Sequence, residues 1–250
     1  MKKKWFIFAL GLIFFLFSSP VSIRIIMEIT HNSNFHARYD MKTVSEVVLV
    51  HPSPTDYSFY GTTINTSHIE KDTKYTIDDW DNKLVTSDIL ITINETTIET
   101  LKDFKVRIND EGFAKYYGNV EYWLVTDKVK NEKSFIIVMK KTNIDFDTVY
   151  DITDAHLNQL EFRTYTVSTD GKIKKQDFSF TDRDPLQTKL MFGISPIGVG
   201  YYTNDLHSMP SLFFPILYPF GIWIIGLILL FYSIPLIVLK KQSWKSEKKH

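Results

Sequence analysis

Two long apolar runs, one near each end of the chain, constrain the fold more than any other feature. The first covers residues 5–23 and contains no charged side chain. The second covers residues 220–239 and is 20 residues long, about what an α-helix needs to cross the hydrocarbon of a bilayer. The sequence therefore predicts a membrane protein with two terminal transmembrane helices.

Lysines flank both runs on the side toward the chain ends. Three of them, Lys2 to Lys4, precede the first run, and five follow the second within residues 240–250. Because lysine-rich flanks stay in the cytoplasm, we expect both termini to be cytoplasmic and the middle of the chain to be exported. The predicted organisation is 1–4 cytoplasmic, 5–23 transmembrane, 28–210 extracytoplasmic, 212–239 juxtamembrane segment and second transmembrane helix, and 240–250 basic cytoplasmic tail.

A cleaved signal peptide is the alternative interpretation of the first run. Residues 5–17 have the length of a signal-peptide core, and residues 18–22 resemble the polar stretch that precedes cleavage. However, Phe17 or Pro20 would occupy the third position before the cleaved bond, where a small residue is needed. We therefore favour an uncleaved anchor, and either interpretation leaves residues 28–210 outside the cytoplasm.

Charge is distributed unevenly along this chain of zero formal net charge. Residues 28–210 contain 28 acidic and 20 basic side chains, a formal charge of −8, while the remaining basic residues lie in or near the two apolar ends. An acidic domain repels nucleic acid and anionic lipid headgroups, so nucleic acid is excluded as a partner and a basic protein surface is favoured. The chain has no cysteine, so the exported domain is held by its own core. This composition is typical of a Gram-positive bacterial cell-membrane protein.

The exported part has mainly the periodicity of β-strands. Short runs rich in β-branched and aromatic residues alternate with turn-forming residues, as in Ser168-Thr169-Asp170-Gly171. We predict a β-rich extracytoplasmic domain, all-β or α+β, with an antiparallel meander over about residues 104–180. The predicted strands are 45–50, 88–93, 104–108, 120–126, 134–140, 161–167 and 172–180.

Other stretches of the exported part give weaker signals. Residues 142–160 are compatible with a short helix or a crossing loop, and residues 96–103 with a second helix. Residues 52–83 are expected to form long loops around at most one strand at 57–63. The glycines and prolines of residues 192–219 predict an irregular tether to the second membrane helix.

One acidic segment partly matches a calcium-binding loop. Oxygen-bearing side chains recur there at the spacing that lets one tight loop wrap a hard cation. The match fails at Thr148, which replaces the glycine of the template, and at its last position, which lacks the long bidentate glutamate. We therefore favour a solvated acidic loop and expect no cofactor. The metal candidates are Asn143, Asp145, Asp147, Asp151 and Asp154.

No catalytic motif is visible in the sequence. The acidic clusters at 78–81 and 182–184 are explained by solvated loops, and paired carboxylates catalyse only at a fixed spatial separation. The seven histidines form no metal-ligand motif, and no nucleophile motif occurs. We therefore predict no enzyme activity and no catalytic residues.

Three functional hypotheses follow from these features. The first is a membrane-anchored extracytoplasmic binding protein, immunity-like (protective) or a surface accessory, that contacts the lipid bilayer through its helices and another protein at the outer face. The second is an accessory subunit of a transporter or cell-envelope machine, and the third is an extracytoplasmic hydrolase. Amphipathic aromatic residues dominate interface anchors, although several of those here are equally suited to packing the sheet. The candidate contact residues are Tyr116, Tyr117, Tyr122, Trp123, Tyr165, Tyr201 and Tyr202.

Overall fold

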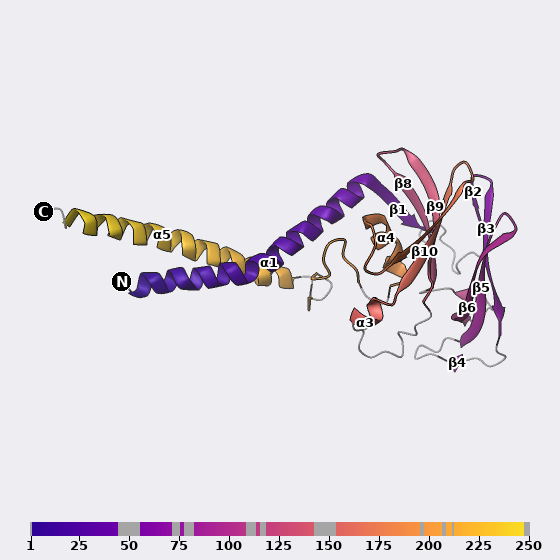
Figure 1. The fold of residues 1–250 in the computed structure, drawn as a ribbon, viewed down its shortest axis with the longest axis horizontal. Helices are drawn as coiled ribbons and strands as arrows, with labels where there is room; N and C mark the ends of the chain where they lie inside the picture. Colours follow the sequence, from indigo (N-terminus) through magenta and orange to yellow (C-terminus); the bar gives the residue numbers. More distant parts are fainter. Residues whose placement is uncertain are drawn as a thin grey trace. The chain divides into compact units, whose positions relative to one another are not determined.

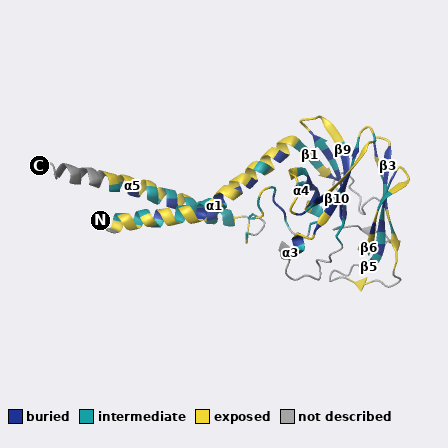
Figure 2. Ribbon diagram, viewed as in Figure 1, coloured by how far each residue is buried: buried dark blue, intermediate teal, exposed yellow. Residues whose placement is uncertain are grey.

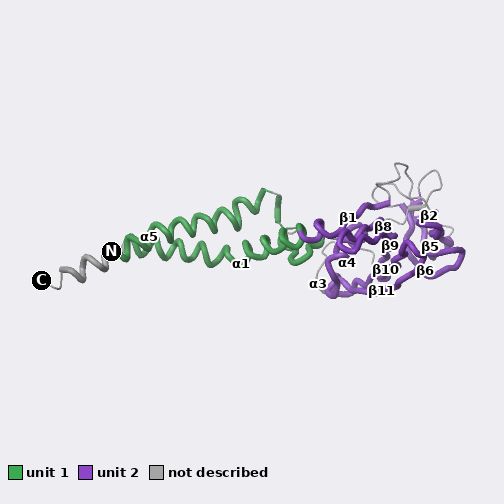
Figure 3. Tube along the Cα trace, turned by 90° about the horizontal axis from the view of Figure 1, so that it is seen from above, with its two compact units in different colours: residues 1–33, 199–250 green, residues 34–198 purple. Residues whose placement is uncertain are grey.

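The protein consists of two compact units, shown in different colours in Figure 3. The helical unit contains residues 1–33 and 199–250, and the sheet domain contains residues 34–198. The computed structural model describes residues 2–44, 56–71, 76–77, 83–108, 114–115, 119–142, 154–195, 198–206, 209–211 and 213–247.

The helical unit is built from the two apolar runs. Helix α1 covers Lys2–Arg38, and α5 covers Ile222–Glu247 after a short π-helical segment, η3, at Ile216–Gly221. Two stretches, Lys3–Arg38 and Ile216–Val238, are long and apolar enough to cross a membrane. Many of their apolar side chains are exposed, as the yellow positions in Figure 2 show. Such exposure suits a lipid environment.

Small residues let α1 and α5 approach closely. A Cβ atom on Gly11 would lie 2.9 Å from Leu229 Cβ, so only glycine fits this crossing. Trp223 adds a polar contact, because its indole N–H donates to Ser19 Oγ across 2.9 Å. The helices are antiparallel, since Lys4 Nζ lies 3.4 Å from the carbonyl oxygen of Leu236 near their outer ends.

The sheet domain contains two antiparallel β-sheets (Figure 1). The five-stranded sheet has the order β1-β8-β9-β10-β11, and the six-stranded sheet has β2-β3-β5-β6-β7, with β4 paired to β5. Strands β8 to β11 follow one another both in the chain and across their sheet. The strands are β1 Tyr39–Thr43, β2 Asp56–Phe59, β3 Thr62–Glu70, β4 Thr76–Ile77, β5 Lys83–Ile93, β6 Thr96–Ile108, β7 Ala114–Lys115, β8 Val120–Asp127, β9 Glu132–Lys140, β10 Glu161–Ser168 and β11 Ile173–Ser179.

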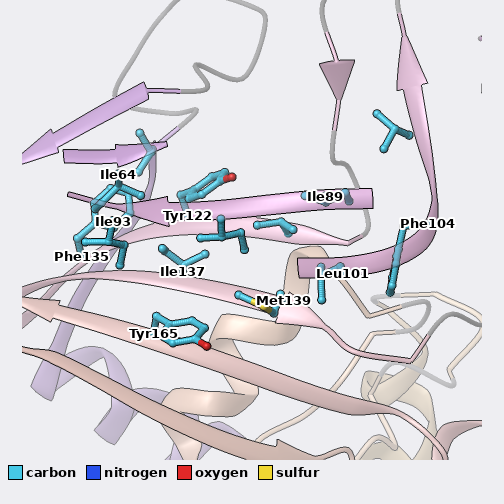
Figure 4. Close-up of a cluster of buried hydrophobic side chains, with 14 of the residues drawn as sticks. Ile64, Ile89, Ile93, Leu101, Phe104, Tyr122, Phe135, Ile137, Met139 and Tyr165 are labelled. Carbon is cyan, nitrogen blue, oxygen red and sulfur yellow. The ribbon is translucent and has the colours of Figure 1, made fainter. Parts of the chain in front are cut away.

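One apolar core is shared by the two sheets (Figure 4). It follows from strand alternation: β5 buries Ile89, Ile91 and Ile93, while β9 contributes Phe135 and Ile137. Burial of these aliphatic and aromatic side chains is the main stabilising term, about 1.5–3 kcal/mol for each fully buried side chain.

The opposite face of the five-stranded sheet is buried as well. On β9, Ile136 and Val138 are buried between the core positions, so both faces of this strand are covered. The covering segment includes α4 at Pro185–Leu190 and the 3-10 turn η2 at Met191–Gly193. Lys189 of α4 places its ammonium 5.7 Å from the ring centroid of Trp123 on β8. A four-residue helix, α3 at Asp154–Leu157, also precedes β10.

Two local predictions are wrong. Residues 96–103 form the first part of β6 rather than a helix, because the turn after Ile93 folds the chain back onto the buried strand β5. Residues 56–70 form a hairpin of β2 and β3 rather than loops around one strand. The predicted meander also begins too early, since β6 pairs with β5 and β7 in the other sheet. The predicted strand at 45–50 lies outside the described residues.

Candidate functional site

A buried carboxylate of α1 holds the segment that leads toward the second membrane helix. Glu28 is only 6% exposed. Its oxygens accept hydrogen bonds from the backbone N–H groups of Tyr201, Tyr202 and Thr203 at 2.8, 2.6 and 2.9 Å. Three charge-assisted hydrogen bonds satisfy a carboxylate that burial would otherwise destabilise. Gly200 is required beside it, because a Cβ there would lie 1.9 Å from the carbonyl oxygen of Thr203 and 3.0 Å from Glu28 Cδ.

Two further contacts join α1 to this segment. One turn before Glu28, Arg24 Nε donates to Asp205 Oδ2 at 2.6 Å. About one turn after it, the His31 ring stacks on Tyr202 with centroids 5.4 Å apart. The spacing of three or four residues places all three side chains on one side of the helix. We call this set, Arg24, Glu28 and His31 with residues 199–205, the clasp.

Burial changes the acid–base behaviour of one clasp tyrosine. Desolvation, helped by the nearby Glu28 charge, raises the pKa of Tyr201 to about 12. The phenol therefore stays neutral and retains its O–H donor throughout the physiological pH range.

A second feature is the set of tight turns at one end of the sheet domain. In the five-stranded sheet, the turns at 128–131 and 169–172 lie at the same end, because Ser134 pairs with Ser168. In the six-stranded sheet, the turns at 60–61 and 94–95 share an end, because Ile64 pairs with Ile93. A Cβ on Gly171 would lie 3.6 Å from Thr62 Oγ1, so the two sets meet. We call these four turns, 60–61, 94–95, 128–131 and 169–172, the turn end.

Local backbone chemistry explains two of these turns. Both turn residues of the β2–β3 hairpin, Tyr60 and Gly61, have positive φ (48° and 83°), as do Asn94 and Glu95 (47° and 63°). Two-residue turns of this kind match the right-handed twist of the flanking strands. Two of the four turns of the turn end are therefore tight two-residue hairpin turns.

The C-terminus of α1 is fixed at the same end of the domain. Tyr39 pairs with Asp127, directly before the turn at 128–131. The Arg38 guanidinium donates to Asp127 Oδ2 at 2.9 Å and lowers the pKa of that carboxyl. Lys128 Nζ donates to the carbonyl oxygen of His36 at 2.8 Å.

A charged network connects the two sheets. Arg163 of β10 makes a bidentate pair with Asp177 of β11, with N–O distances of 2.6 and 2.7 Å, and also binds Glu99 of β6. Tyr165 donates to Glu99 Oε2 at 3.0 Å. The Arg163 hydrogen bonds lower the pKa of Asp177 to about 2, and burial with the Glu99 contact raises that of Tyr165 to about 12. Each acid has a cationic or phenolic partner, so the network is a structural tie between sheets.

The aromatic contact candidates fall into three groups. Tyr122, Trp123 and Tyr165 are buried inside the sheet domain, which favours the packing interpretation for these three. Tyr201 and Tyr202 lie in the clasp, where the Tyr202 side chain is exposed. The remaining two, Tyr116 and Tyr117, lie outside the described residues.

Glu28 and the turn end were not identified as candidate sites from the sequence. The lysines on either side of Val129 and Ile173 were a signal in the sequence that could have indicated the turn end.

The structure does not test the calcium-loop candidates. Asn143, Asp145, Asp147 and Asp151 lie outside the described residues, and only the backbone of Asp154 is described, at the start of α3. Among the residues that are described, no three His, Asp or Glu side chains come together to hold a metal ion.

In the acidic cluster at 182–184, Asp184 has a structural role. Its side chain accepts a hydrogen bond from Gln187 N at 2.8 Å and caps α4.

Comparisons of this chain with known protein families, with curated proteins and with solved structures found no match.

Proposed function

We propose that the chain is a membrane-anchored extracytoplasmic binding protein that recognises another protein at the outer face of the membrane. The main support for the membrane anchoring is the antiparallel pairing of α1 and α5, which brings Lys4 beside Leu236. Both ends of the chain then leave the bilayer on one side, and the lysines of both flanks favour the cytoplasm as that side. Residues 28–210 are exported as one insertion between the two helices.

The clasp supplies the described part of the proposed contact surface. Tyr202 combines an exposed ring with a backbone fixed by Glu28, so little conformational freedom is lost when a partner packs against it. Tyr116 and Tyr117 complete the proposed set. The formal charge of −8 on residues 28–210 favours a basic partner and an association rate that falls with salt.

Site-specific photocrosslinking in intact cells tests this proposal. A photoreactive amino acid is placed at Tyr202 or Tyr117 of the full chain, and at Lys42 as an exposed control on β1. We expect a discrete protein adduct at the tyrosine positions that is weaker at high salt and absent at Lys42. Protease added outside should digest the middle of the chain and spare tags at both ends. No adduct, together with hydrolysis of cell-wall or lipid-linked substrates by the purified chain, would favour the hydrolase hypothesis.

The clasp favours one alternative, an accessory subunit of a transporter or cell-envelope machine. It ties the segment at 199–205 to α1 through a buried carboxylate, an ion pair and a ring stack. Such a joint would transmit a displacement of one helix to the other. This alternative predicts that a photoreactive amino acid at an exposed position of α5, such as Ile228, forms an adduct with a membrane protein.

A further inference from the structure

The turn end has the opposite charge character to the domain that carries it. Its turns, together with the two residues on each side of every turn, expose five lysines against three acids, whereas residues 28–210 as a whole are acidic. The exposed lysines are Lys128, Lys130, Lys133, Lys172 and Lys174, and the acids are Glu95, Glu132 and Asp170. A domain with this polarity has a preferred orientation in front of a negatively charged surface.

Two neighbouring hairpins repeat one local pattern. Val129, 76% exposed, lies between Lys128 and Lys130, and Ile173, 43% exposed, lies between Lys172 and Lys174. Their strands are consecutive in one sheet, so the two tips lie on the order of 10 Å apart. Tyr60, 62% exposed, is at the tip of the β2–β3 hairpin at the same end.

An apolar side chain between two lysines suits the boundary of a membrane. The apolar group enters the headgroup region, while the lysine stems lie along it and their ammonium groups reach the phosphates. Each lysine close to an anionic membrane strengthens partitioning by about fivefold. A soluble acidic partner would satisfy the charges as well, but only the boundary of a bilayer also covers the exposed apolar side chains of Val129 and Ile173.

We propose that the turn end binds the surface of an anionic lipid bilayer through the Lys128-Val129-Lys130 and Lys172-Ile173-Lys174 tips. This inference rests on the proposed membrane anchoring, and it does not depend on the protein partner.

The absence of cysteine makes a direct test practical. The full chain carrying Val129→Cys, labelled with a fluorophore, is placed in nanodiscs of phosphatidylcholine alone or mixed with phosphatidylglycerol, each containing a headgroup-linked quencher. We expect several-fold stronger quenching in the anionic discs, and its loss in about 1 M salt, where charges are screened beyond about 3 Å. Ile173→Cys should behave in the same way.

Charge reversal supplies the matched control. Lys130→Glu with Lys174→Glu should abolish the quenching, whereas Lys42→Glu with Lys102→Glu makes the same charge change at exposed strand positions and should largely preserve it. Equal quenching in both lipids, or equal loss with both variants, would overturn the proposal. Polyglutamate, added in solution, offers an acidic polypeptide as a competing partner. If it shielded the probe from the quencher equally in both kinds of disc, the turn end would bind an acidic polypeptide rather than lipid, and the proposal would also be overturned. A chain that fails to enter nanodiscs would instead refute the anchoring.

Discussion

A Cβ atom on Gly226 would lie 3.0 Å from the carbonyl oxygen of Gly11, so α1 and α5 meet backbone to backbone at this pair. Close approach is how membrane helices gain packing energy, because lipid gives them no hydrophobic drive to associate. The neighbouring hydrogen bond from Trp223 to Ser19 adds a directional contact to this helix packing.

Gly226→Leu should therefore separate the helices, with an overpacking cost of about 1–3 kcal/mol. The readout is crosslinking of Lys4→Cys to Leu236→Cys by a short bifunctional thiol reagent in the otherwise cysteine-free chain. We expect efficient crosslinking with Gly226 and poor crosslinking with leucine there. Ile228→Phe, at an exposed position of the same helix, is the control. Undiminished crosslinking in Gly226→Leu would show that this pair does not set the helix spacing.

Removal of the clasp carboxylate should loosen residues 201–203. Glu28→Ala leaves three N–H groups without their acceptor, which lowers the local opening free energy by about 2 kcal/mol. Amide hydrogen exchange at these positions should accelerate roughly 30-fold. Glu132→Ala, at an exposed site on β9, should leave the exchange unchanged. Unchanged protection in Glu28→Ala would mean that other contacts hold the segment.

The Arg163 network should make part of the stability acid-sensitive. Asp177 has a folded-state pKa of about 2, below the ordinary unfolded value of about 3.9. Its contribution is therefore complete above about pH 4 and is lost as the pH falls toward 2. Because the side chain is 49% exposed, the effect is modest, within about 1 kcal/mol. Urea unfolding of Asp177→Asn should show lower stability near neutral pH and a shallower loss below about pH 4. A parallel pH dependence in both proteins would exclude Asp177 as a source.

Local pattern predicted strands β8 to β11 of the five-stranded sheet, but neither β1 of that sheet nor the pairing of the strands in the domain. Strands β8, β9 and β10 were expected within two residues of their bounds, because their alternating β-branched and aromatic residues are a strong short-range signal. The sequence of residues 96–103 is also compatible with a helix, and only the pairing of this stretch with β5 makes it a strand.

The clasp was beyond prediction for a different reason. Glu28 and Tyr201 are 173 positions apart, and nothing in either local sequence marks the contact. A glutamate just beyond an apolar run normally indicates a solvated boundary, so burial with three hydrogen bonds requires the fold. The two apolar helices, by contrast, follow directly from run length and composition.

The β2–β3 turn offers a test of backbone conformation alone. Gly61 has φ of 83°, and an added Cβ would meet no atom within 4 Å, so any cost of Gly61→Ala comes from the left-handed backbone. We expect a loss of about 1 kcal/mol, measured as a lower midpoint of thermal or urea unfolding. Gly61→Asn should recover part of it, because asparagine tolerates positive φ. At the preceding position, Tyr60→Asn should stabilise the hairpin slightly, since Asn-Gly is the preferred pair in this turn. Equal stability of the alanine and glycine forms would contradict the assigned turn geometry.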